Sequence, residues 1–74
     1  MLASNEVFEK FENTVKNIHF EVHAVYEPDD SEVFGGCYLA AVDLFNPGTT
    51  YKVWFKINDE GTICVEHLER WWFG

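Results

Sequence analysis

The segment HFEVH contains the residue types that most often bind metal ions. His19, Glu21 and His23 alternate with apolar residues, so on a β-strand they would share one face. Residues i and i+4 of a strand are about 13 Å apart, too far for two histidines to bind one ion unaided. Cys64 and His67 of the segment CVEH would point to opposite faces and help little. We expect no metal and no cofactor, and a small metal- or ligand-binding domain is the weakest alternative.

Nucleophilic catalysis would need a serine or cysteine beside a base and an orienting acid. Ser4 and Ser31 fall at a helix cap and in a loop, and Cys37 follows a pair of glycines without a nucleophile elbow. The glycines are too isolated for a phosphate-binding loop, and a chain of 74 residues leaves little room for a deep cleft. We therefore expect no catalytic residue and no enzymatic activity.

Acidic residues dominate the charge of the chain. Thirteen acids against five bases give a formal net charge of −8. The run EPDDSE contains four of these acids: Glu27, Asp29, Asp30 and Glu32. Such a charge opposes direct binding to nucleic acid or to an anionic membrane, and it favours a partner with a basic surface. An alternative interpretation is that the acids serve solubility alone.

Aromatic residues are the second unusual feature. Three tryptophans, three tyrosines and seven phenylalanines exceed what one small core should need. Trp54 is expected on the exposed face of a strand, while Trp71 and Trp72 are adjacent and cannot point the same way. One of these two rings would close the core and the other would remain for a contact. Because tryptophan dominates interface hot spots, we predict that these three residues and the EPDDSE acids bind a partner. The alternative is that the rings only fill the core.

One helix and four strands must position these residues. A helix is predicted over 5–17, with Ser4 or Asn5 as its cap, because apolar residues recur there at three- and four-residue spacing. Alternating apolar residues and turn signals predict four strands: 18–26, 33–45 with a kink at its glycines, 50–57, and 62 to about 67. In the first strand, Tyr26 should face the core and Val25 the opposite side.

The third and fourth strands should form a hairpin around the loop Asp-Glu-Gly, with its glycine in the left-handed region. That loop places Phe55 opposite Val65 on the core face. It places Trp54 opposite Glu66 on the reverse face, which is expected to be open.

Two further features of the sheet, a strand register and the end of the last strand, are predicted less directly. Around the turn Asn-Pro-Gly-Thr, Asp43 should pair with Lys52. The last strand should end or bulge near His67, because a straight continuation would bury the carboxylate of Glu69. The remaining residues, HLERWWFG, would then form a helical turn or an irregular tail.

These elements predict a single α+β domain over 1–74. One N-terminal amphipathic helix should pack on one face of a four-stranded antiparallel meander, in the order α-β-β-β-β, followed by an aromatic C-terminal tail. Two cysteines do not make a disulfide framework, and the start of the chain has no basic stretch with an apolar run. A cytoplasmic protein is therefore expected.

In size, charge and lack of a catalytic motif, the chain resembles small inhibitors from phages and mobile elements, including anti-CRISPR proteins. The resemblance implies a viral protein that binds a larger, nucleic-acid-binding partner and covers its basic surface, without binding nucleic acid or membrane itself. The alternative is a homodimer with a structural or housekeeping role, paired through an exposed sheet edge, Trp54 and the tail.

Overall fold

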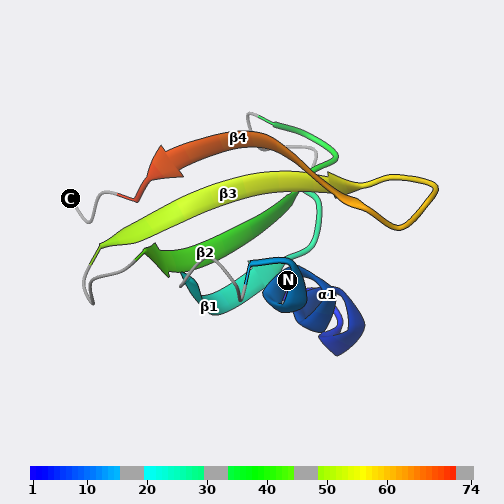
Figure 1. The fold of residues 1–74 in the computed structure, drawn as a ribbon. Helices are drawn as coiled ribbons and strands as arrows, with labels where there is room; N and C mark the ends of the chain where they lie inside the picture. The colour runs from blue at the N-terminus through cyan, green and yellow to red at the C-terminus, as the bar shows by residue number, and fades with distance from the viewer. Residues whose placement is uncertain (16–19, 30–33, 45–48, 72–74) are drawn as a thin grey trace.

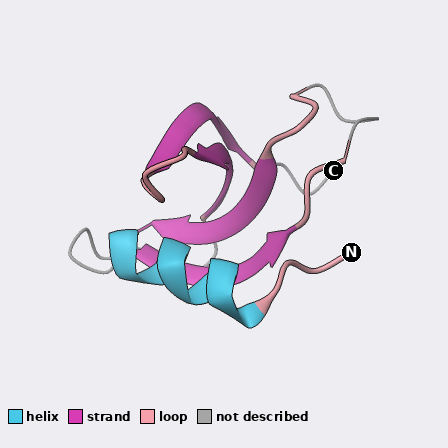
Figure 2. Ribbon diagram, turned by 90° about the vertical axis from the view of Figure 1, so that its right-hand side faces the viewer, coloured by secondary structure: helices cyan, strands magenta, loops and turns pink. Residues whose placement is uncertain are grey.

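A computed structural model describes residues 1–15, 20–29, 34–44 and 49–71 of the chain. One helix precedes four strands in the described residues: α1 (Asn5–Val15), β1 (Phe20–Tyr26), β2 (Tyr38–Leu44), β3 (Thr50–Ile57) and β4 (Ile63–Arg70). The strands form one antiparallel sheet in the order β1-β2-β3-β4. The helix lies against one side of this curved sheet (Figures 1 and 2). The predicted α+β meander is confirmed.

Ser4 caps α1, as predicted. The backbone N–H of Val7 donates to Ser4 Oγ at 3.4 Å, and the N–H of Phe8 donates to the Ser4 carbonyl at 3.0 Å. The first contact satisfies one of the amide groups that a helix N-terminus leaves without an intrahelical partner, and the second is the first i→i−4 bond of the helix. The last predicted turn of the helix, at 16–17, lies outside the described residues.

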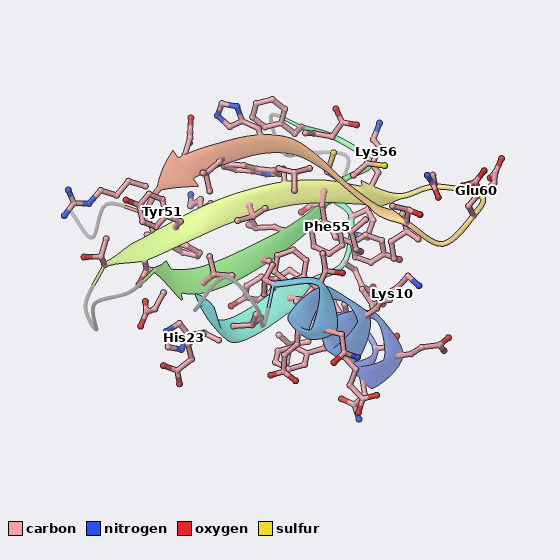
Figure 3. All side chains as sticks on the ribbon, viewed as in Figure 1. Lys10, His23, Tyr51, Phe55, Lys56 and Glu60 are labelled. Carbon is pink, nitrogen blue, oxygen red and sulfur yellow. The ribbon has the colours of Figure 1, made fainter. Side chains whose placement is uncertain are left out.

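The buried core lies between α1 and the sheet. The ring of Phe11 stacks on Phe55 of β3, with ring centroids 4.6 Å apart, and Phe55 also stacks with Tyr38 of β2 at 5.3 Å. Figure 3 shows the labelled side chain of Phe55 on the α1 side of the sheet. The buried residues of this core are Phe11, Val15, Val25, Ala40, Val42, Val53 and Phe55. Ring stacking therefore connects the helix to the middle of the sheet.

A β-bulge in β1 reverses the predicted faces of its second half. The neighbours of His23 pair with Val42 and Ala41, two consecutive residues of β2, so His23 is an extra residue in the ladder. Val25 is consequently buried in the core, with 2% of its surface exposed, and Tyr26 faces the reverse side. The predicted orientation of these two residues was wrong, because alternation holds only in a strand without an inserted residue.

The β2–β3 pairing differs from the prediction by two residues. Asp43 pairs with Thr50 and not with Lys52. Because the shift is even, Val42 and Ala40 still face the core, as predicted. The Thr50 hydroxyl donates to Asp43 Oδ1 at 2.8 Å, which favours the observed register. The proline-glycine turn predicted between these strands lies outside the described residues.

The segment before β2 is a turn, whereas a strand over 33–45 was predicted. β2 begins only at Tyr38. Gly36 has a φ of 80°, and the N–H of Cys37 donates to the carbonyl of Phe34 at 3.2 Å. The left-handed conformation of the glycine interrupts an extended strand, so the two glycines end the ladder and do not merely kink it.

The β3–β4 hairpin has the predicted register next to its loop. The N–H of Asn58 donates to the carbonyl of Thr62 at 3.0 Å, and Gly61 has a φ of 81°. Phe55 lies opposite Val65, as predicted. Local loop chemistry was therefore sufficient to predict this pairing.

Further along the hairpin, a bulge at Glu66 sets Trp54 opposite His67 and not opposite Glu66. The predicted bulge near His67 is confirmed. The strand nevertheless continues past Glu69, so the helical turn or irregular tail predicted to start at His67 was wrong for this segment. After the bulge Glu69 lies opposite Lys52 on the reverse face, which removes the cost of burying its carboxylate.

Candidate functional site

The side of the sheet away from α1 carries a hollow of about 240 Å³, here called the reverse-face hollow. It is lined by Met1, Tyr26, Glu27, Asp29, Cys37, Leu39, Trp54 and Trp71. Four of these, Glu27, Asp29, Trp54 and Trp71, are residues predicted to bind a partner. Tyr26 and Trp71 also line an adjoining hollow of about 360 Å³ that reaches His23, Ala41 and Thr50. The fold therefore gathers most of the predicted contact residues in one place.

The N-terminal residues hold the acidic rim of this hollow. The N–H of Ala3 donates to the carbonyl of Val25 at 2.8 Å, and the N–H of Glu27 donates to the carbonyl of Met1 at 2.9 Å. Residues 1–3 thus extend the edge of β1 where the chain leaves the strand. Glu27 and Asp29 follow directly, and both are exposed. Two other predicted rim acids, Asp30 and Glu32, lie outside the described residues.

Trp54 forms the floor of the hollow and is not the exposed contact that was predicted. It does lie on the reverse face, but only 4% of its surface is exposed. The ring of Phe34, from the turn before β2, lies 5.1 Å from it, and the ring of His67 lies 5.4 Å from it. The predicted exposure of Trp54 was wrong because a turn distant in sequence covers this part of the face, while its role in partner binding stays a prediction. The indole N–H of Trp54 is buried and has no hydrogen-bond acceptor among the described residues.

Trp71 forms one wall of the hollow. Its backbone N–H donates to the carbonyl of Thr50 at 2.7 Å, and its side chain is half-buried. The Lys52 ammonium lies 4.7 Å from the centre of the Trp71 ring and 5.9 Å from that of Trp54. Such distances allow cation–π attraction, so Lys52 connects the two rings. Trp72, the other residue in the predicted division of roles, lies outside the described residues.

The two histidines that the structure describes each lie close to a carboxylate. His23 Nε2 lies 2.7 Å from Asp43 Oδ2, at the end of the sheet opposite the hairpin loop that carries Glu60 (Figure 3). His67 Nε2 lies 3.1 Å from Glu69 Oε1, without hydrogen-bond geometry. Within the described part of the chain, no three histidine, cysteine or acidic side chains are grouped so that they could hold a metal ion. The remaining histidine of the HFEVH segment lies outside that part.

Hydrogen bonds with His23 and Thr50 change the pKa of Asp43. The hydrogen bond with His23 lowers the pKa of Asp43 from its ordinary value of 3.8, and the bond from Thr50 acts in the same direction. Partial burial of the carboxyl opposes both effects. Hydrogen bonds to a carboxylate favour its charged form, whereas loss of water favours the neutral form. The folded protein therefore binds a proton at this site less readily than the unfolded chain does.

We expect Asp43→Asn to destabilise the protein at neutral pH and to lose this effect in acid. Since the folded pKa is depressed, the carboxylate stabilises the fold above about pH 4, and this contribution disappears as the pH falls through the folded pKa. Urea unfolding of wild type and variant at pH 7 and at about pH 3 tests this, because the difference in unfolding free energy should shrink at the lower pH. Glu9→Gln, at an exposed helix position, is the control. An equal difference at both pH values would contradict the prediction.

A second surface was missed by the sequence analysis. An apolar groove of about 200 Å³ lies on the α1 side, lined by Phe11, Thr14, Val15, Val42, Val53, Ile63, Val65 and Leu68. Val65 and Leu68 of β4 are 60% and 53% exposed. The helix packs chiefly against β1, and a helix about 10 Å wide covers roughly two strands spaced about 4.8 Å apart. One helix is therefore too narrow to cover a four-stranded sheet. This comparison of widths could have predicted from the sequence that half of the sheet face stays uncovered.

Both cysteines are free thiols, with Cys37 buried and Cys64 half-buried. None of the described helical segments has the length and apolar character needed to cross a bilayer. Comparison of the chain with protein-family models, with curated proteins and with solved structures finds no match.

Proposed function

We propose that the protein is a non-enzymatic binder of a basic surface on a larger protein, and that the reverse-face hollow with its acidic rim makes the contact. The observation that carries this proposal is the meeting of Glu27 and Asp29 with Trp71, which is far from them in the sequence, around the floor made by Trp54. Pockets for small molecules usually measure about 300–1,000 Å³. The hollow, at about 240 Å³, is smaller than that and can hold a side chain of a protein surface, while the adjoining hollow of about 360 Å³ lies at the lower end of the range.

The charge of the molecule supports the same partner. The net charge is −8. The acids that contribute to it include Glu6, Glu9 and Glu12 of the helix, which are exposed and make no ion pair with a described residue. Carboxylates without a cation of their own are attracted to lysine and arginine on another protein and accelerate its encounter. An acidic surface of this kind is complementary to proteins that bind nucleic acid.

Binding to such a surface would exclude nucleic acid from it, so the protein would act as an inhibitor or regulator. The setting proposed from its size and charge is the cytoplasm, where a phage or mobile-element protein of the anti-CRISPR kind meets a nucleic-acid-binding complex. Free thiols suit a reducing compartment of this type.

The test begins with a pull-down from lysate of the source organism or its host, followed by binding measurements with the purified partner. The dissociation constant should rise roughly tenfold or more between about 0.1 and 0.5 M salt, because surface ion pairs are screened. Nucleic acid that binds the partner should compete with the protein. Salt-insensitive binding, or a ternary complex with nucleic acid, would contradict the proposal.

A pair of matched variants locates the contact. Glu27→Gln/Asp29→Asn removes two charges from the rim, and Glu9→Gln/Glu12→Gln removes two charges from the exposed side of α1, across the sheet. Both variants have the same net charge, so only the position differs. The rim variant should bind several-fold more weakly than the helix variant. Equal affinities would place the contact elsewhere.

Self-association is the second candidate, and the apolar groove beside β4 favours it. Val65 and Leu68 are exposed, and they line the groove together with buried core residues such as Phe11 and Val53. Two copies could cover these side chains by joining their grooves. Light scattering at micromolar concentration would detect the dimer, and Leu68→Glu should return it to a monomer. A monomeric wild type would eliminate this candidate.

A further inference from the structure

We infer that the reverse-face hollow binds one lysine or arginine side chain of a peptide segment. The cation would lie against the rings of Tyr26 and Trp71, and the rim carboxylates would supply the opposite charge. This inference rests on the proposed function, because it names the group that the basic partner inserts. The hollow combines the two features that recognise organic cations, aromatic faces and carboxylates.

The aromatic walls already attract a cation within the molecule. The Lys52 ammonium lies 4.7 Å from the centre of the Trp71 ring, at a distance typical of cation–π contacts. Lys52 does not line the hollow, whereas Trp71 does. The Trp71 ring is therefore close enough to a cation for cation–π attraction, and the lysine concerned lies outside the lining of the hollow.

The acidic rim makes a cation the preferred guest over a neutral group of similar shape. Glu27 is exposed and forms no ion pair with a described residue, and Asp29 lies two residues further along the same rim. No described lysine or arginine lines the hollow, although Met1, which carries the terminal amino group, does. A negative carboxylate beside an aromatic face favours an ammonium or a guanidinium, because both attract positive charge.

The floor indicates that the guest is part of a peptide. The indole N–H of Trp54 is buried, and it has no acceptor among the described residues. A buried donor without a partner is costly; because this nitrogen is buried, the side chains that cover it would have to shift before an arriving carbonyl oxygen could satisfy it. A peptide offers such a carbonyl next to a basic side chain, whereas a free amine does not.

The experiment uses four small probes with the 74-residue chain: N-acetyl-lysine methylamide, N-acetyl-arginine methylamide, N-acetyl-norleucine methylamide and n-butylamine. Norleucine has the shape of the lysine stem without its charge, and butylamine has the charge without a carbonyl. The three tryptophans give three indole N–H signals in a ¹⁵N-correlated NMR spectrum, which single Trp→Phe variants would assign. We expect saturable shifts of the Trp54 and Trp71 signals with the lysine and arginine probes.

The lysine probe should bind roughly tenfold more tightly than the norleucine probe, with a millimolar dissociation constant. Butylamine should bind more weakly than the lysine probe. Trp71→Leu keeps an apolar wall but removes the aromatic face, so it should abolish the preference for lysine over norleucine. The rim variant Glu27→Gln/Asp29→Asn should reduce that preference.

Equal shifts with the lysine and norleucine probes would overturn the inference, since the hollow would then be an apolar slot. The absence of shifts with every probe up to tens of millimolar would also overturn it. These failures are distinct from failure of the proposed function. If the proposed function itself is wrong, the salt-dependent complex with a basic partner does not form, whatever the small probes do.

Discussion

Phe55→Ala is expected to leave the protein largely unfolded at ambient temperature. Phe55 is 0% exposed, and its ring stacks on Phe11 from the helix and on Tyr38 from the neighbouring strand. Truncating a buried phenylalanine costs about 3–5 kcal/mol, because the lost contacts leave a cavity. A single core of this size rarely provides more than about 3–5 kcal/mol of net stability. The substitution therefore removes most or all of the free energy of unfolding.

Circular dichroism during thermal and urea unfolding measures this effect. Phe55→Leu retains most of the volume and should remain folded with a lower midpoint, which keeps the prediction measurable if the alanine variant does not fold. Leu68→Ala is the control on the neighbouring strand, because Leu68 is 53% exposed and loses little buried area. A cooperative transition within a few degrees of wild type for Phe55→Ala would show that the stack is not central to the fold.

Trp54→Ala should also destabilise the protein by about 3–5 kcal/mol, the cost of truncating a buried tryptophan. Only 4% of this side chain is exposed, and it packs under Phe34 and beside His67. Its first role is to hold the turn before β2 against the reverse face. A loss of partner binding in this variant would follow from a loss of folding.

Trp54→Phe separates packing from the hydrogen-bonding group. The phenyl ring keeps an aromatic floor, and no intramolecular hydrogen bond to a described residue is lost, because the indole N–H has none. The variant should therefore lose less stability than Trp54→Ala, by urea unfolding. Trp71→Ala should cost less than either alanine truncation in the core, since Trp71 is half-buried. A fully folded Trp54→Ala with unchanged stability would restore the view that Trp54 is mainly a contact residue.

Much of the architecture could be predicted from local signals. The apolar spacing and Ser4 cap predict α1, and strict alternation predicts β3 to the residue. The Asp-Glu-Gly loop predicts the pairing of Phe55 with Val65. These features depend on residues close together in the chain, and short-range geometry is enough to determine them.

Two β-bulges and one register shift could not be predicted in the same way. The bulges at His23 and Glu66 reverse the faces of every residue that follows them, so Val25 enters the core and Glu69 leaves it. The energy of a bulge depends on pairing with another strand and on the face that becomes buried, and one strand's sequence contains neither.

The sequence alone determined the order of the elements, the acidic and aromatic character of the surface, and the residue types of the candidate site. Only the tertiary structure decided that Phe34 covers Trp54, that Val65 and Leu68 remain exposed, and that Glu27, Asp29 and Trp71 share one hollow. The physical reason is that alternation specifies a side of a strand, whereas burial depends on which distant segment packs over that side.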